Sequence, residues 1–317
     1  MQKAVFLDLD SVDTGDLDIR CINSTLDNWQ FYPSIQSSDV KQAIAGAAIV
    51  VSNKVVLDAD TIKNSPSLKL ICVSATGTNN VDLSAAKMHD VLVCNVRDYA
   101  TPSVTQHVFT LILALMTNLK RYEQAVEKGD WTNSQQFCLL DYPISELSGK
   151  TLGIVGYGVL GKSVAKIAQA FGMQVCLQTR TKGDSDFPYV SLTQLLQSSD
   201  IVSLHCPLTE QTRNMIGADE FALMKPHSIL INAARGGIVH EQALADALLE
   251  GKIGGAGIDV LSVEPPGADN PLLNPSIPNL IVTPHIAWAS RESRQRCLEE
   301  VAKNIRAYQA GKPRNLV

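Results

Sequence analysis

Three residues with complementary chemistry follow short apolar runs in the second half of the chain: Arg235, Glu264 and His285. An arginine can hold a carboxylate through two parallel hydrogen bonds and polarise a neighbouring carbonyl. A histidine can donate a proton near neutral pH, and a carboxylate beside it orients the ring and stabilises its protonated form. Together they suit the reduction of a 2-keto acid. Taken singly, they also fit surface charges and a structural histidine.

A glycine-rich turn upstream of these residues forms a second candidate site. Gly156, Gly158 and Gly161 make a G-x-G-x-x-G pattern between a predicted strand and a predicted helix. The first glycine permits a tight turn, the second lets a pyrophosphate approach the backbone, and the third lets the helix pack on the strand. The N–H groups of about Val159 and Leu160 would bind the phosphates. The alternative is a glycine-rich turn without a ligand.

The residues after the next predicted strand bear on the choice between NAD and NADP. Proteins selective for NAD usually have an acidic residue there, which binds the ribose hydroxyls. This chain has Thr179 at that position, with Arg180 and Lys182 beyond it. Such groups would bind the additional phosphate of NADP, whereas a carboxylate would repel it. We therefore expect NADP or NAD as coenzyme, with NADP favoured. The alternative is a solvated basic loop.

The elements that position these residues fall into two groups. Short runs rich in valine and isoleucine alternate with helical stretches, as in buried parallel sheets. The expected strands of the first group are 4–9, 48–52, 69–73 and 91–95. The second group has expected strands at 151–155, 173–178, 201–205, 228–232, 255–259 and 280–283, with helices at 162–171, 192–198, 218–223 and 241–250. The pattern predicts an α/β protein with doubly wound parallel sheets.

The two groups are connected by a helix that Thr101 caps and Pro102 begins, with a long apolar segment over 104–119, and by a polar stretch over 121–146. A final amphipathic helix spans 291–310. The polar stretch shows little strand or core pattern. Its aromatic residues, Trp131 and Phe137 among them, could cover an apolar surface of another subunit.

The composition excludes several classes of protein. The chain has 317 residues, enough for two domains, of which 45% are hydrophobic and 19% charged. A net charge of −5 gives no reason to expect nucleic acid or a membrane as partner. The longest apolar run, 108–116, is too short for a membrane span, and the N-terminus does not resemble a signal peptide. Seven cysteines without a C-x-x-C pair indicate a cytoplasmic protein. No metal site is predicted.

Six segments strongly resemble the D-isomer-specific 2-hydroxyacid dehydrogenase family, in the order the family has them. They are 75–82, 156–161, 205–209, 232–239, 257–266 and 283–288. The resemblance implies a Rossmann-type coenzyme domain, 99–288, inserted in a flavodoxin-like substrate domain made of 1–98 and 289–317. It also implies an active site in the cleft between the domains and a homodimer formed mainly by the coenzyme domains.

The resemblance also implies roles for individual residues. Arg235, Glu264 and His285 match the catalytic arginine, glutamate and histidine. The loop whose backbone N–H groups hold the substrate carboxylate matches Thr76, Gly77 and Thr78. The pyrophosphate contacts match Val159 and Leu160, and the contacts to the nicotinamide half match Cys206, Ala233, Ala234 and Asp259, with Thr212 as a further polar contact nearby. Pro207, Arg235 and His285 are also expected to contact the coenzyme.

Residues around the expected site narrow the substrate. Segments 95–104 and 285–288 are most similar to the glycerate dehydrogenase, or hydroxypyruvate reductase, branch. Phosphoglycerate dehydrogenases commonly have an arginine where this chain has Val73, and many have a regulatory domain beyond the position of Val317. We therefore expect NAD(P)H-dependent reduction of hydroxypyruvate or glyoxylate to D-glycerate or glycolate. Trp288 is expected either to wall the substrate pocket or to pack at the domain interface.

Other functions stay open on the sequence alone. The chain could be a 2-hydroxyacid dehydrogenase of D-lactate or phosphoglycerate type, or a formate- or phosphite-oxidising relative. It could also be a non-catalytic, dinucleotide-sensing protein that acts as a corepressor. A purely structural protein fits least, because packing alone does not require the arginine, glutamate and histidine behind a phosphate loop.

Overall fold

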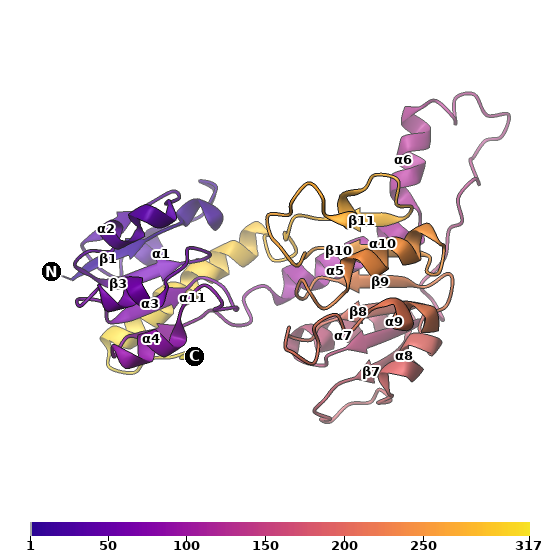
Figure 1. Ribbon diagram of the computed structural model, residues 1–317. Coiled ribbons are helices and arrows are strands. Elements are labelled where there is room, and N and C mark those ends of the chain that lie inside the picture. The colour runs from indigo at the N-terminus through magenta and orange to yellow at the C-terminus, as the bar shows by residue number, and fades with distance from the viewer. Residues whose placement is uncertain (1) are drawn as a thin grey trace. The chain divides into compact units, whose positions relative to one another are not determined.

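The computed structural model describes residues 2–317, which fold into two compact units (Figure 1). The first unit contains the chain up to Ala100 together with Trp288–Val317, and the second is Thr101–Ala287. The chain therefore passes between the units twice. The first crossing comes two residues later than the sequence suggested, and the second comes one residue earlier.

The first unit is built on a five-stranded parallel sheet in the order β2-β1-β3-β4-β5. Its strands are β1 (Lys3–Phe6), β2 (Trp29–Phe31), β3 (Ala47–Ser52), β4 (Leu70–Val73) and β5 (Leu92–Cys94). This is the strand order of flavodoxin-like folds, and it reverses direction between β1 and β3. Sequence analysis missed β2, which has three residues, none of them fully buried.

Helices cover both faces of this sheet. Side chains alternate along a strand, so Phe6 of β1 points to one face and Val5 to the other. The last helix, α11 (Arg291–Gln309), packs on the face of Phe6, which explains why the two chain ends form one unit. The other face is covered by α2 (Val40–Ala43), α3 (Ala59–Lys63) and α4 (Leu83–Met88). The unit also contains η1 (Leu9–Ser11), α1 (Arg20–Asn23) and η2 (Ser37–Asp39).

The second unit contains a six-stranded parallel sheet in the order β11-β10-β9-β8-β6-β7. Its strands are β6 (Thr151–Val155), β7 (Gln174–Gln178), β8 (Ile201–Leu204), β9 (Ile229–Asn232), β10 (Gly255–Ile258) and β11 (Leu280–Val282). Tyr189 adds a parallel bridge to Leu177 at the outer edge of β7, the position of the third strand in dinucleotide-binding sheets. The strand order reverses between β6 and β8.

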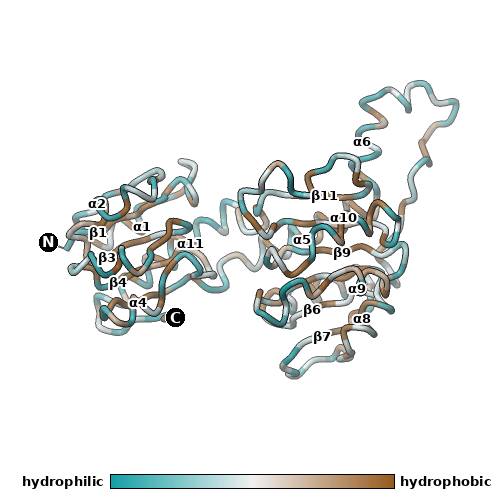
Figure 2. The backbone as a smooth tube through the Cα atoms, in the orientation of Figure 1, coloured by the Kyte–Doolittle hydropathy of each residue, from teal (hydrophilic) through white to brown (hydrophobic). Residues whose placement is uncertain are grey.

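The helices of the second unit form a layer on each face of its sheet. One layer consists of α5 (Thr101–Met116) and α7 (Val159–Ala170). The other consists of α8 (Leu192–Ser198), α9 (Ala218–Leu223) and α10 (Glu241–Leu249), with η3 (Pro271–Leu273) beside α10. Figure 2 shows the strands as largely hydrophobic segments between helices that also carry polar residues. The expected architecture of two doubly wound parallel sheets is confirmed.

One part of the second unit extends away from its sheet. It consists of α6 (Leu119–Glu127) and the segment 128–146 (Figure 1). Sequence analysis predicted no element in 121–146, yet α6 reaches Glu127. Phe137 in this segment is 89% exposed and Leu140 is 80% exposed. Across residues 2–317, none of the helices combines the length and the apolar character that a membrane span requires.

Candidate active site

The glycine-rich turn follows β6, where the strand order of the second sheet reverses. Gly156 has a φ of +95°, and a β-carbon there would lie 2.7 Å from the carbonyl carbon of His205. A β-carbon on Gly161 would collide with the carbonyl oxygen of Gly156. The chain itself therefore requires glycine at both positions: at Gly156 because of its left-handed backbone and the close approach of His205, and at Gly161 because of the close approach alone.

Gly158 has no such requirement from the chain. A β-carbon there would meet no atom of residues 2–317 within 4 Å. The residue precedes the 12-residue helix α7, and the N–H groups of Val159 and Leu160 donate to no acceptor in the described chain. Unused N–H groups at the start of a helix bind phosphate, and a glycine beside them lets the phosphate approach. This turn fits a dinucleotide.

His205, directly after β8, borders the same turn and was not singled out from the sequence. Burial lowers the pKa of its imidazole to about 4, so the ring is neutral at neutral pH. Its Nε2 lies 2.9 Å from Ser203 Oγ, while its Nδ1 is buried without a hydrogen-bond partner among residues 2–317. A buried nitrogen without a partner is uncommon in proteins and adds to the fit of this region to a polar ligand. The next residue is Cys206, and burial raises the pKa of its thiol.

The loop after β7 contains the residues expected to select the coenzyme. Thr179 is partly buried, and Arg180 and Lys182 are exposed. Lys182 Nζ lies 5.7 Å from the centroid of the Tyr189 ring, and the Tyr189 hydroxyl donates to the carbonyl of Gly183 at 2.8 Å. The end of β7 thus presents a hydroxyl and two cations where an NAD-selective protein has a carboxylate.

Arg235 follows β9, and the buried Asn232 fixes the backbone around it. Asn232 Oδ1 accepts a hydrogen bond from the N–H of Ala234 at 3.1 Å, and its Nδ2 donates to the carbonyl of Arg235 at 3.0 Å. One N–H of the exposed guanidinium donates to the carbonyl of Ala234 at 2.7 Å. Sequence analysis gave Asn232 no role, because a single asparagine at the end of an apolar run carries no pattern.

Glu264 and His285, which follow β10 and β11, are in direct contact. His285 Nδ1 lies 2.6 Å from Glu264 Oε2. The other carboxylate oxygen, Oε1, accepts a hydrogen bond from the N–H of Leu261 at 2.8 Å, which holds the glutamate in place. The side chains of His285 and Glu264 are 33% and 36% exposed. The pairing uses Nδ1 and leaves Nε2 as the nitrogen for a substrate.

Asp259, at the end of β10, supports the backbone of His285. His285 has a left-handed φ of +54° and donates its N–H to the carbonyl of Asp259 at 2.8 Å. The Asp259 carboxylate, 1% exposed, accepts hydrogen bonds from Thr283 Oγ1 at 2.6 Å and from the next two backbone N–H groups after His285 at 2.9 and 3.0 Å. Burial raises the pKa of Asp259, but hydrogen bonds from His107, Thr283 and these N–H groups outweigh it and hold the pKa below its usual value. The expected contact of Asp259 with the nicotinamide half stays a prediction.

The loop expected to bind the substrate carboxylate follows β4 in the first unit. Thr76 Oγ1 donates to the carbonyl of Val96 at 2.9 Å, and Asn95 Nδ2 donates to the carbonyl of Thr76 at 2.7 Å. The N–H groups of Gly77 and Thr78 donate to no acceptor among residues 2–317. The loop therefore offers two backbone donors of the kind that bind anions.

The structure brings some of the predicted residues together. Because β9, β10 and β11 are parallel neighbours, Arg235, Glu264 and His285 lie at the same edge of the second sheet. Trp288, which was expected to line the substrate pocket or pack at the domain interface, belongs to the first unit. Its ring packs edge-on against Tyr99, with the ring centroids 6.2 Å apart. A place for Trp288 in the substrate pocket stays a prediction.

Two predicted coenzyme contacts lie in a turn after β8. The hydroxyl of Thr212 donates to the carbonyl of Pro207 at 2.7 Å and accepts the N–H of Thr209 at 2.7 Å. Thr212 therefore shapes this turn through its own side chain. Ala233 and Ala234, also predicted contacts, are buried after β9.

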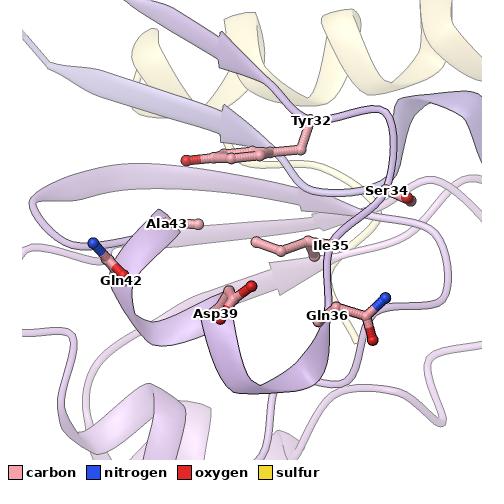
Figure 3. A pocket seen from close by; sticks show the side chains of 7 residues that line it. All are labelled: Tyr32, Ser34, Ile35, Gln36, Asp39, Gln42 and Ala43. Atoms are coloured by element: carbon pink, nitrogen blue, oxygen red, sulfur yellow. The ribbon is translucent and has the colours of Figure 1, made fainter.

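Two cavities lie apart from these residues. The first, about 390 Å³, is in the first unit between α2 and the segment after β2, and Tyr32, Ile35 and Asp39 are among its lining residues (Figure 3). The second, about 450 Å³, lies beside α10 in the second unit. Neither is lined by a residue predicted to bind substrate or coenzyme.

Comparison with known proteins gives consistent matches over the whole chain. The D-isomer specific 2-hydroxyacid dehydrogenase NAD binding domain matches residues 109–287. The chain is 46% identical to a glycerate dehydrogenase of Methylorubrum extorquens, over 100% of this chain and 99% of that protein. It is 37% identical to a hydroxypyruvate reductase of Blautia hydrogenotrophica, over 99% of each. A solved NADPH-dependent glyoxylate/hydroxypyruvate reductase of Sinorhizobium meliloti matches with a TM-score of 0.85 at 27% identity, over 100% of this chain and 98% of that one.

Proposed function

The chain belongs to the D-isomer specific 2-hydroxyacid dehydrogenase family and is an oxidoreductase, and we propose that it reduces a small unphosphorylated 2-keto acid, hydroxypyruvate or glyoxylate. The products would be D-glycerate or glycolate. Relatives named glycerate dehydrogenase and hydroxypyruvate reductase support this choice. So does Val73 at the end of β4, which offers no charge to a phosphorylated substrate.

The proposal rests mainly on the 2.6 Å contact between His285 and Glu264, at the sheet edge that also carries Arg235. A carboxylate on Nδ1 fixes the orientation of the ring and directs Nε2 towards a substrate. A histidine that only filled space would have no need of a carboxylate partner on Nδ1.

In the proposed reaction, each group of the chain has one task. The N–H groups of Gly77 and Thr78 and the guanidinium of Arg235 bind the substrate carboxylate, and Arg235 also polarises the ketone. A bound nicotinamide dinucleotide in its reduced form supplies the hydride that C2 of the acid receives. His285 donates the Nε2 proton to the ketone oxygen, which gives the hydroxyl group of the product. The neutral ring then takes a proton from solvent through its exposed side.

We further propose that NADP is the preferred coenzyme. The N–H groups of Val159 and Leu160 would hold the pyrophosphate. Thr179, Arg180 and Lys182 would bind the additional phosphate, since all three groups donate hydrogen bonds and two carry positive charge. The NADPH dependence of the Sinorhizobium meliloti enzyme supports this choice.

We also propose that the chain forms a homodimer through the segment 128–146. Phe137 and Leu140 are almost fully exposed, and Trp131 and Ile144 are more than half exposed. Such a group of exposed apolar side chains is typical of a surface that another chain covers. Analytical ultracentrifugation of the parent and of Phe137→Asp tests this, and a monomeric parent would contradict it.

The proposed activity is tested by following absorbance at 340 nm with NADPH or NADH and a panel of 2-keto acids. We expect the highest kcat/KM for hydroxypyruvate or glyoxylate, and lower values for pyruvate and phosphohydroxypyruvate. A preference for the phosphorylated acid would indicate an enzyme of phosphoglycerate type. Binding of NADPH without turnover of any acid would contradict the proposal and indicate a sensing protein.

A further inference from the structure

We propose that Asn95 is a positioning residue for the loop of Thr76 and Gly77, and that the buried amide of Asn304 and the backbone carbonyl of the half-buried Asn315 hold Asn95 in place. The inference rests on the proposed function, because it concerns the same carboxylate-binding loop. All of these residues belong to the first unit.

The direction of one peptide group decides whether this loop can bind a carboxylate. The C=O of Thr76 and the N–H of Gly77 belong to one planar peptide and point in opposite directions. Asn95 Nδ2 donates to the Thr76 oxygen at 2.7 Å and thereby turns the Gly77 N–H to the other side. Without this bond the peptide can turn over, because glycine adopts a wide range of backbone angles. A carbonyl oxygen would then replace the donor and repel a carboxylate.

The peptide before it is fixed in a similar way. The N–H of Val96 donates to the carbonyl of Ala75 at 3.0 Å, and the Thr76 hydroxyl donates to the carbonyl of Val96 at 2.9 Å. Residues 95 and 96 therefore bind the carbonyl groups of Ala75 and Thr76. The N–H side of the loop is left free for an anion.

Asn95 itself is bonded through every polar group it has. Its Oδ1 accepts a hydrogen bond from Arg97 Nε at 3.2 Å, so the amide can face only one way: reversal would set two acceptors against each other at Thr76 and two donors at Arg97. Its backbone N–H donates to the carbonyl of Asn315 at 3.1 Å. Its carbonyl accepts from Asn304 Nδ2 at 2.8 Å.

Asn304 and Asn315 connect this residue to the end of the chain. Asn304 lies on α11, is 1% exposed, and accepts a hydrogen bond from Asn315 Nδ2 at 3.1 Å. Asn315 has a left-handed φ of +52°, which asparagine tolerates, and the following Leu316 forms an antiparallel bridge with Cys94. A buried amide costs free energy unless it is fully hydrogen-bonded, and an apolar residue would fill the space more cheaply. The buried amides of Asn95 and Asn304 are therefore explained by the backbone carbonyls to which they donate.

Positioning and simple stabilisation predict different measurements. If the amides only stabilise the first unit, their removal lowers the free energy of unfolding and leaves the KM for the keto acid unchanged. If they orient the Gly77 N–H, the KM rises, because this donor binds ground state and transition state alike. Affinity for NADPH should not change, since Val159 and Leu160 lie in the second unit.

The decisive variant is Asn95→Leu, which keeps the side chain uncharged and equally branched while it removes the amide. We expect the KM for hydroxypyruvate to rise about tenfold to a hundredfold, with kcat within a few-fold of the parent and an unchanged Kd for NADPH by fluorescence. Asn315→Gly keeps the backbone and its bond to Asn95, so we expect a rise of only about two- to fivefold. Val301→Ala, a cavity variant on α11, is the matched control for lost stability and should keep the parental KM.

A parental KM in Asn95→Leu, with stability alone reduced, would overturn the inference. If that variant does not fold, Asn315→Gly decides, and a KM equal to that of Val301→Ala counts against the inference. If the parent reduces no 2-keto acid, the proposed function fails by itself. In that case the crystal structure of either variant still tests the inference. A well-ordered Thr76 carbonyl that points in the same direction as in the parent would contradict it.

Discussion

At the switch point of the first sheet, between β1 and β3, the chain's own carboxylate occupies the anion-binding position. Asp8, after β1, accepts hydrogen bonds from the backbone N–H groups of Asn53 at 2.9 Å and Lys54 at 2.7 Å, after β3. At the matching point of the second sheet, between β6 and β8, the N–H groups of Val159 and Leu160 donate to nothing in the described chain. The two sheets thus have a similar strand order but different loops at the switch point. In the first unit an aspartate follows the first strand and fixes the neighbouring loop, whereas in the second unit a glycine turn follows it and leaves the N–H groups for a phosphate.

The two units also differ in how they support the groups assigned to the substrate. The first unit offers backbone N–H groups of the loop after β4, and neutral amides set the direction of their peptides. The second unit offers the side chains of Arg235 and His285. The Glu264 carboxylate holds the ring of His285, and the backbone carbonyl of Asp259 accepts the His285 N–H. Backbone donors need a fixed peptide plane, whereas a side-chain proton donor needs a neighbour that fixes the orientation of its ring. The variants below act on one side of this comparison at a time.

The largest effect is expected at the proton donor of the second unit. His285→Asn should lower kcat by roughly 10²–10⁴-fold, the usual contribution of a general acid, while NADPH still binds by fluorescence titration. His227→Gln is the matched control, because His227 is an exposed histidine of the same unit in contact with Asp200, away from the predicted site. Retention of more than half of the parental kcat in His285→Asn would remove this residue from the mechanism.

A smaller loss is expected when the charge of Arg235 is kept but its shape is changed. Arg235→Lys replaces a planar, two-pronged donor with a single ammonium group. One lost charge-assisted hydrogen bond costs roughly 1.5–3 kcal/mol, so kcat/KM should fall about 10- to 150-fold, shared between a higher KM and a lower kcat. Steady-state kinetics with hydroxypyruvate measures both. Parental kinetics in the lysine variant would mean that a point charge is sufficient.

Coenzyme choice tests whether the loop after β7 binds the additional phosphate of NADP. The parent should prefer NADPH over NADH by about one to two decades in kcat/KM, from one charge-assisted contact. Thr179→Asp combined with Arg180→Ala should reverse this preference, since it adds repulsion and removes attraction. Asp184→Asn, further along the same exposed loop, is the control. Equal specificity constants for the two coenzymes in the parent would contradict the preference and indicate a dual-coenzyme enzyme.

At the first switch point the expected effect is on stability instead of catalysis. Asp8→Asn keeps the shape of the side chain but removes the charge that several N–H groups share, so the free energy of unfolding in urea should fall by about 1.5–3 kcal/mol. Asp10→Asn, an exposed aspartate two residues along, should change it little. Loss of NADPH binding in Asp8→Asn would contradict the contrast between the two switch points.

Sequence patterns located the elements of the second unit better than those of the first. Helices α8 and α9 begin and end where periodicity placed them, because each lies between clear strands. The four-residue helices α1 and α2 are too short to show a period, and β2 is stabilised by its neighbour β1 more than by its own residues.

The candidate catalytic residues at the strand ends could be predicted from the sequence, but the residues that hold them in position through hydrogen bonds could not. Asn95 and Asn304 are 209 positions apart in the sequence, and neither belongs to a recognisable motif. His107 likewise reaches Thr283 Oγ1, at 3.0 Å, from a helix 176 positions earlier. Such pairs exist only once the chain has folded, so local spacing carries no signal for them.

The smallest effect is expected at the amino-terminal edge of the second sheet, opposite the predicted site. Burial by itself would raise the pKa of Asp200, but the N–H of Thr151 and the side chains of Lys225 and His227 outweigh it and lower the pKa to about 2. A carboxyl whose pKa is lowered by folding stabilises the protein above its unfolded pKa of about 3.9, and this stabilisation is lost as the pH falls towards 2. Asp200→Asn should therefore cost about 1 kcal/mol of unfolding free energy at pH 7, after allowance for screening by solvent, and progressively less below pH 4. Urea unfolding between pH 7 and pH 3 measures this, and kcat at pH 7 should stay parental. A stability difference that does not shrink with falling pH would show that Asp200 acts through its shape and not through its charge. A lower kcat would show that the amino-terminal edge of this sheet affects the predicted site at the opposite edge.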